Sequence, residues 1–275
     1  MNTDIKPIVQ NLHFKNICHT CGTRYAEELP KSCLVCDDDR QYVPVSGQKW
    51  TSYAELSQTH TIRFGNPLPN VYNLRVSPGF GIAQRAHLIL SPPGNILWDC
   101  LPFLDEATVA FIKSKGGLKA IAISHPHYYG LMAGWAETFD CPIYLHKADS
   151  QWVMDKTNRI VFFEEGRKAL WDGIEIVHTG GHFDGSTILY APGIGDKGSV
   201  FVGDTLQVAL SRRFISIMYS YPNHIPLPLK EINRIGDIIM QLNFDNMYGA
   251  FEWQNIESGA KELFENSIRK YNSLG

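Results

Sequence analysis

Three histidines and one aspartate of this chain follow apolar segments and are of the right types to bind a metal ion. His125 and His127 come directly after the apolar segment LKAIAIS, in the sequence SHPHYYG. Residues at positions i and i+2 of an extended chain point the same way, so both imidazoles can reach one ion. His182 follows a later apolar segment in a glycine-rich turn, and Asp204 ends another. These four residues predict a site with three protein nitrogens, whose remaining position holds water or a carboxylate.

Four cysteines near the N-terminus form a second candidate metal site. They make two C-x-x-C pairs with eleven residues between them: Cys18, Cys21, Cys33 and Cys36. Each pair places two thiolates on one side of a tight turn, and two such turns close a tetrahedron around one ion. Zinc is the expected ion at a four-sulfur site, and iron binds the same geometry. The two isolated cysteines, Cys100 and Cys141, are predicted to be small buried apolar residues.

The elements that must position these residues begin at about residue 51. Residues 1–50 are polar and cysteine-rich and predict a small four-cysteine module, whereas residues 51–275 predict a larger domain. In that domain, apolar runs broken by Gly and Pro predict strands. Helices are expected after Asp105 and near residues 131–139, 228–242 and 256–273, the last with an apolar stripe that starts at Ile256. The pattern predicts an α/β (α+β) fold, with two sheets sandwiched between helices.

The composition is that of a globular protein. Of the 275 residues, 44% are hydrophobic and 19% are charged. The 25 Lys and Arg against 28 Asp and Glu leave a net charge of −3, whereas a dedicated nucleic-acid-binding protein usually has a basic excess. No apolar stretch approaches the ~20 residues of a membrane helix, and the N-terminal segment lacks the apolar centre of a secretory signal. We therefore expect a cytoplasmic protein whose partners are neither nucleic acids nor membranes.

The order of the histidine and aspartate segments resembles the metallo-β-lactamase superfamily across roughly residues 52–270. That family has H-x-H-x-D-H after a strand, then a later G-H and a later G-D. This chain has HPH at 125–127, GH at 181–182 and GD at 203–204. The resemblance implies an αββα sandwich and a metal held by the three histidines and Asp204. It also implies that Asp99, which matches an early strand-end aspartate of the family, supports the ligands from behind.

The chain departs from the family pattern at the residues that hold a second metal. Tyr129 stands where the family has the aspartate of its motif, and Gly130 stands where it has the last histidine. A phenol with a pKa near 10 is a poor replacement for a carboxylate, and glycine offers no ligand. The late family histidine is also missing from MYGAFEW, and His224 is the late candidate that remains. These departures predict a single metal at the histidine site.

The cysteine segment resembles a rubredoxin-type module. The sequence C-x-x-C-G-x-x-Y over residues 18–25 matches the first metal-binding turn of that type, and the short loop is similar to the shortened versions in rubrerythrins. In the second turn, Leu34 replaces the usual Pro and Asp37 the usual Gly. These departures favour zinc over iron. We expect one zinc in the histidine site and one in the four-cysteine site, with iron as the alternative in either.

The function implied by the resemblance is that of a metal-dependent hydrolase acting on a small molecule. A metal-bound hydroxide would attack an ester, lactone or thioester carbonyl. Asp204 would orient the ion or accept a proton, and Tyr129 would donate a hydrogen bond to the developing oxyanion. Two alternatives stay open. One is a redox protein related to flavodiiron pairings of rubredoxin-like and metallo-β-lactamase domains, and the other is a non-catalytic binding module.

Overall fold

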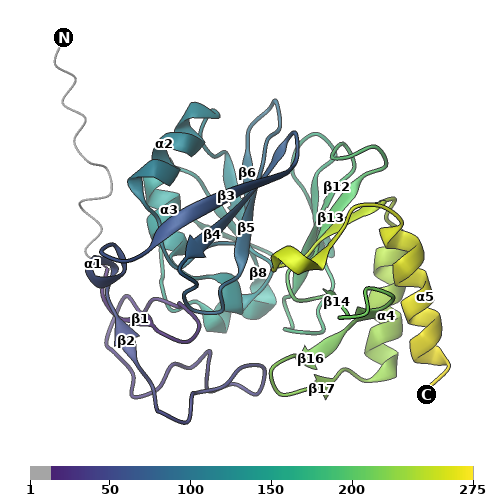
Figure 1. Cartoon of the computed structure of the whole chain (residues 1–275), viewed down its shortest axis with the longest axis horizontal. Coiled ribbons are helices and arrows are strands. Elements are labelled where there is room, and N and C mark those ends of the chain that lie inside the picture. Colours follow the sequence, from purple (N-terminus) through teal and green to yellow (C-terminus); the bar gives the residue numbers. More distant parts are fainter. Residues whose placement is uncertain (1–13, 275) are drawn as a thin grey trace.

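The computed structural model describes residues 14–274, in which two large sheets pack face to face (Figure 1). The first sheet has seven strands in chain order: β3 (Thr61–Leu68), β4 (Val71–Ser77), β5 (Arg85–Ile89), β6 (Ile96–Trp98), β7 (Ala120–Ala122), β8 (Ile143–His146) and β9 (Ile160–Phe163). Its first four strands are antiparallel, and β6 to β9 are parallel. The apolar runs of β6 and β7 are buried along their whole length, because layers cover both faces of the sheet there.

The second sheet carries the later strands of the described chain. Its order is β10 (Arg167–Ala169), β11 (Glu175–His178), β12 (Thr187–Ala191), β13 (Ser199–Phe201), β18 (Asn246–Tyr248) and β19 (Asn255–Ile256). Apolar side chains of the two sheets, among them Trp98 and Phe201, fill the space between them. The strand ends that carry the candidate metal ligands therefore meet at one edge of the sandwich.

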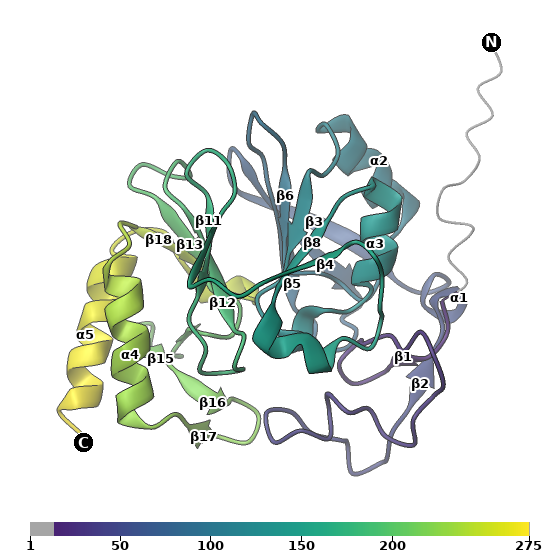
Figure 2. The same ribbon diagram turned by 180° about the vertical axis from the view of Figure 1, so that it is seen from behind.

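Helices cover the outer face of each sheet (Figures 1 and 2). The α-helices of the described residues are α1 (Tyr53–Leu56), α2 (Glu106–Ser114), α3 (Met132–Phe139), α4 (Leu229–Met240) and α5 (Ala260–Asn272). Three single-turn or short 3₁₀ segments join them: η1 (Pro126–Tyr128), η2 (Lys147–Trp152) and η3 (Glu252–Gln254). Helices α2 and α3 pack on the first sheet and α4 and α5 on the second, each through a buried apolar cluster. The two-sheet sandwich between helices that the sequence predicts is confirmed.

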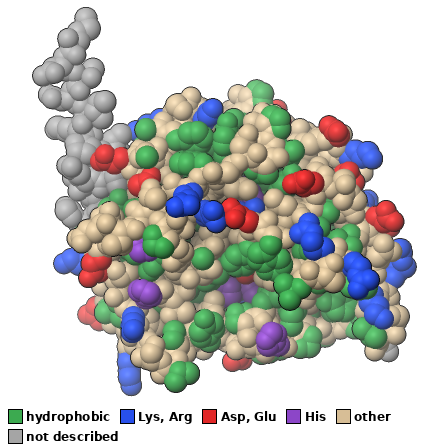
Figure 3. All heavy atoms as spheres, viewed as in Figure 1, with side chains coloured by type: hydrophobic (Ala, Val, Ile, Leu, Met, Phe, Trp, Pro, Cys, Tyr) green, Lys and Arg blue, Asp and Glu red, His purple; other side chains and the backbone are tan. Residues whose placement is uncertain are grey.

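Short strand pairs complete the chain at the edge that holds the candidate site. They are β1 (Ile17–Cys18) with β2 (Trp50–Thr51), β14 (Gln207–Val208) with β15 (Ile215–Ser216), and β16 (Met218–Ser220) with β17 (Ile225–Pro226). The first pair closes the four-cysteine module, which lies beside the first sheet (Figure 1). No helix in residues 14–274 is long and apolar enough to cross a membrane. On the face shown in Figure 3, basic and acidic side chains are interspersed.

One predicted boundary is wrong. Ile256 lies in β19, where it pairs with Met247, and does not belong to the last helix. Helix α5 begins at Ala260, directly after Gly259, whose φ of 71° is incompatible with a continuing right-handed helix. The apolar residue at 256 therefore serves the sheet, while Phe264 lies on the buried face of the helix as predicted.

Candidate metal centre

The structure brings His125, His127, His182 and Asp204 together in one buried cluster. One nitrogen or oxygen of each lies within 4.8 Å of those of the others. The His182 Nε2 atom is 3.3 Å from His127 Nδ1, and the Asp204 Oδ2 atom is 3.5 Å from His125 Nε2 and 4.0 Å from His182 Nε2. Donor atoms at about 2.0–2.1 Å from a tetrahedral metal lie roughly 3.3 Å apart, so the cluster has nearly the spacing of a metal site.

The turn after β7 holds the first two histidines. Asp99 accepts a hydrogen bond from the Ser124 backbone N–H (2.8 Å), and the Ser124 hydroxyl lies 2.9 Å from His125 Nδ1. This chain of contacts leaves His125 Nε2 facing the cluster. Burial raises the pKa of Asp99 to about 6. Asp99 thus supports a ligand from behind, in the position that the family resemblance implies.

A backbone carbonyl determines which ring nitrogen of the third histidine, His182, carries the proton. His182 Nδ1 donates to the Tyr219 carbonyl at 2.8 Å, because a carbonyl oxygen can only accept. The neutral ring therefore presents the lone pair of Nε2 to the cluster. Burial, followed by the nearby His125, lowers the pKa of His182 to about 3 and that of His127 well below its usual value. Both rings are neutral at pH 7 and need lose no proton to bind a metal.

The carboxylate of Asp204 is held at the end of β13. Gln207 donates to its Oδ1 at 3.1 Å, which leaves Oδ2 for the histidines. Gly203 makes the approach possible, since its φ is 50° and a Cβ there would come within 2.7 Å of Ser124 side-chain atoms. Burial would raise the pKa of Asp204, but its hydrogen bond to His125 and its electrostatic attraction to His125 and His182 lower it overall. The carboxylate is therefore ionised.

The donor set fits a divalent cation. The Nε2 atom of His125 faces the cluster and is buried without a hydrogen-bond partner among the described residues. Next to it lies an ionised carboxylate that is only 6% exposed. An unpartnered buried nitrogen and a buried negative charge are costly unless a cation joins them. His125, His127, His182 and Asp204 would hold that ion.

A tyrosine that the sequence did not single out contacts this cluster. The ring of Tyr128 lies 4.4 Å from that of His125, and its phenol contributes to the lowered pKa of Asp204. Tyr128 is the third residue after His125, and in a 3₁₀ turn residues three apart lie on the same side. That spacing was the available signal. Tyr129, like Tyr128, is buried in the apolar cluster of the first sheet, and its assignment as an oxyanion donor stays a prediction.

The position of Gly130 has no room for a metal-binding side chain. Its φ is 46°, and a Cβ would lie 3.0–3.1 Å from the backbone of Leu101 and Pro102. The Gly130 carbonyl also accepts a hydrogen bond from the Arg24 backbone N–H of the cysteine module (3.4 Å). His224 is exposed in the turn between β16 and β17 and is not part of the cluster.

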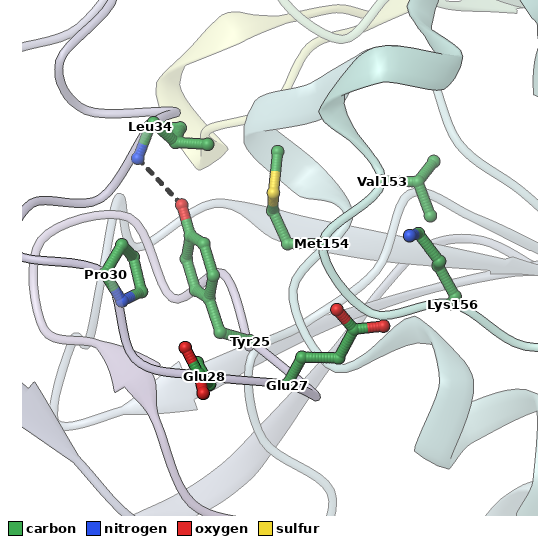
Figure 4. A pocket seen from close by; sticks show the side chains of 8 residues that line it. All are labelled: Tyr25, Glu27, Glu28, Pro30, Leu34, Val153, Met154 and Lys156. Carbon is green, nitrogen blue, oxygen red and sulfur yellow. Dashed lines mark hydrogen bonds between the residues drawn. The ribbon is translucent and has the colours of Figure 1, made fainter.

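The four predicted cysteines also lie together, and all are buried. Cys18 Sγ is 3.7 Å from Cys36 Sγ, and Cys21 Sγ is 3.6 Å from Cys33 Sγ. Sulfurs at about 2.3 Å from a tetrahedral metal lie about 3.8 Å apart, so the cluster fits one such ion. The Tyr25 hydroxyl donates toward Cys33 Sγ (3.4 Å) and accepts from the Leu34 N–H (2.7 Å; Figure 4). The two isolated cysteines, at 100 and 141, are buried as predicted.

Known proteins share the sequence or the fold of this chain. No protein-family model matches the chain. It is 38% identical over 260 residues to "Uncharacterized protein YmaE" of Bacillus subtilis (strain 168), with 93% of this chain and 94% of that protein covered.

Solved metallo-β-lactamases share the fold. The enzyme from Erythrobacter litoralis superposes with a TM-score of 0.57 at 15% identity, over 77% of this chain and 96% of its own. FIM-1 from Pseudomonas aeruginosa, in its mono-zinc form, gives 0.53 at 13% identity, over 78% and 96%. DIM-1 exposed to ceftazidime gives 0.56 at 14%, over 78% and 98%. The chain thus belongs to the same family as Bacillus subtilis YmaE and has the metallo-β-lactamase fold, extended by an N-terminal four-cysteine cluster.

Proposed function

We propose that this protein is a metal-dependent hydrolase with a single catalytic ion, most simply zinc, at the histidine cluster. The observation that carries the proposal is the convergence of three imidazoles and one ionised carboxylate in a buried site. A divalent ion held there would lower the pKa of a water molecule to roughly 7 and so supply hydroxide at neutral pH. The restricted space at Gly130 supports one ion rather than two.

The side chains around the cluster suit attack on a carbonyl group of an ester, lactone or thioester. Asp204 is ionised and can accept a proton from the attacking water or orient it. Burial raises the pKa of Tyr128 well above its usual value, so its phenol keeps its proton and can donate to a developing oxyanion. Attack on the carbonyl carbon then breaks its bond to the leaving oxygen or sulfur, which takes up a proton. The products are a carboxylic acid and an alcohol or thiol.

The four-cysteine cluster has a structural role in this proposal. Its sulfurs have the spacing of a closed tetrahedral site, which leaves no position for a substrate. We assign zinc to this cluster as well. An iron-based redox role is the alternative.

The proposal is tested first by metal analysis of protein purified without added metal. We expect two zinc ions per chain, no visible colour, and hydrolysis of at least one compound in a screen of aryl esters, lactones and thioesters. His127→Ala should lose one zinc and the hydrolysis, whereas His224→Asn, at an exposed histidine, should keep both. A red iron spectrum, or a fully metallated protein inactive in every hydrolytic screen, would count against the hydrolase.

A further inference from the structure

The cysteine module reaches across to the histidine cluster through the segment after its second metal-binding turn. Asn223, in the turn between β16 and β17, donates from Nδ2 to the carbonyls of Asp39 and Gln41, both at 2.9 Å. The two views of the chain show this part of the module beside the β16–β17 turn (Figures 1 and 2). Strand β16 also supplies the Tyr219 carbonyl that orients His182. The hydrogen bonds of Asn223 therefore attach residues 39–41 to the strand pair that borders the histidine cluster.

Arg40 lies between Asp39 and Gln41, and its side chain packs beside the histidine cluster. Its guanidinium carbon is 4.3 Å from the ring centre of Phe183 and 4.6 Å from that of Tyr219. The Phe183 ring is in turn 4.9 Å from the ring of His127 and 5.2 Å from that of His182. One aromatic layer therefore separates the guanidinium from the histidines. The Arg40 side chain is only 12% exposed.

The guanidinium has hydrogen-bonding capacity to spare. Its Nη1 donates to both carboxylate oxygens of Asp38, at 2.9 and 3.0 Å. Its Nε is buried and has no partner among the described residues. A guanidinium carries five N–H groups in a planar fork that matches a carboxylate, and the aromatic contacts hold that plane in place. The Arg40 guanidinium is therefore a cation one aromatic ring away from the histidine cluster. Asp38 neutralises its charge but leaves some of its N–H groups without an acceptor in residues 14–274.

We propose that Arg40 binds the carboxylate of the substrate, so that the cysteine module determines the substrate class of the metal site. This inference rests on the proposed hydrolase function and narrows its substrates to esters, lactones or thioesters that carry a carboxylate. In the free protein Asp38 neutralises Arg40, and the incoming carboxylate takes up the free N–H groups or replaces Asp38. An ion bound by the four cysteines would fix the turn that precedes Arg40.

The test compares matched neutral and anionic compounds on the zinc-loaded full chain. Phenyl acetate and 4-acetoxybenzoate are the ester pair, compared by kcat/KM. Phenol and 4-hydroxybenzoate are the ligand pair, compared by NMR titration, which needs no turnover. Wild type should favour the anionic member of each pair by about tenfold or more, since charge-assisted hydrogen bonds to Arg are strong. Arg40→Gln should lose this preference, so that its kcat/KM for 4-acetoxybenzoate falls to that for phenyl acetate and its affinity for 4-hydroxybenzoate falls to that for phenol.

Two further variants separate substrate binding from a structural role of Arg40. Asp38→Asn removes the competing carboxylate, so it should strengthen binding of 4-hydroxybenzoate, whereas a purely structural ion pair predicts that both variants weaken it. Arg63→Gln, at an exposed arginine of β3, should change nothing. An anion preference that survives in Arg40→Gln, or that is absent from wild type, overturns the inference. If no ester, lactone or thioester of the screen is hydrolysed but the binding preference follows Arg40, the hydrolase proposal fails and the anion site stands.

Discussion

The two candidate metal-binding clusters of this protein are built in opposite ways. The four cysteines fall within 19 consecutive residues, and each pair is held by one tight turn. The histidine cluster draws on residues from 125 to 204, on strand ends of two different sheets. Its ligands are oriented by residues even farther away, such as Tyr219. The first cluster needs only local chain geometry, whereas the second exists only when the sandwich is folded.

The clusters also differ in charge. Four thiolates around a divalent ion leave a net negative centre that attracts no nucleophile, which suits a structural ion. Three neutral imidazoles and one carboxylate leave the ion with a net positive charge, so it can polarise water or a carbonyl group. The comparison therefore predicts that an ion at the cysteines would stabilise the fold and that an ion at the histidines would take part in chemistry.

The largest expected effect follows from removing two histidine ligands together. The double variant His125→Ala and His127→Ala should lose one of two zinc ions and all measurable ester, lactone or thioester hydrolysis. The protein should still fold, because the cysteine cluster and the apolar clusters are untouched. Elemental analysis with a thermal melt checks both points. Loss of the cysteine-bound zinc in this variant would show that the clusters are not independent.

The second largest effect is expected from a double variant of the four-cysteine cluster. Cys33→Ser with Cys36→Ser should lower the melting temperature by about 10 °C or more, since metal binding supplies folding free energy to a segment with little apolar core. The histidine-site zinc should remain. Cys141→Ser is the control, because it changes a buried thiol outside the cluster. Unchanged stability after loss of the cysteine-bound ion would contradict a structural role.

The adjacent tyrosines sharpen the description of the histidine cluster. Tyr128→Phe should lower kcat by about 10²–10³ at constant zinc content, as expected for loss of one oxyanion donor. Tyr129→Phe tests the role that the sequence predicts for Tyr129. Geometry favours a smaller effect there, because Tyr128 is the one that contacts His125. A larger loss in Tyr129→Phe would return the donor role to that residue.

The smallest effect concerns pH and the packing behind the histidine cluster. His146 of β8 stacks on His178 of β11 at 3.8 Å, which joins the two sheets. Burial, followed by the charge of His178, lowers the pKa of His146 to about 4, while Glu165 acts in the opposite direction. His146 therefore binds a proton near pH 6.5 in the unfolded chain, but only near pH 4 in the folded protein. Stability contributed by this group is full above about pH 6.5 and is lost as the pH falls toward 4.

His146→Phe should flatten this part of the stability curve. Denaturant melts between pH 4 and 7 measure it, with His19→Asn, at an exposed histidine, as the control. An unchanged slope in His146→Phe would show that another group, such as a metal ligand, sets the pH dependence.

Features that depend on neighbouring residues can be predicted from the sequence alone. The C-x-x-C pairs predict one cluster because the chain needs only a tight turn to close each pair. The apolar runs predict buried strands, and the i, i+2 histidines predict two imidazoles on one side of a strand end. The family resemblance supplied the order in which His182 and Asp204 join them, and the solved structures confirm its fold.

Features that depend on segments far apart in the chain become visible only in the folded structure. The contact of Tyr128 with the cluster is the exception, because it follows from the local 3₁₀ turn after His125. Gly130 is confined by the backbone of Leu101, which no local pattern reveals. Arg40 packs on the aromatic layer beside the histidine cluster, because Asn223, more than 180 positions later, anchors its backbone neighbours. Such contacts form when the sheets pack, so they cannot be predicted from the spacing of residues along the chain.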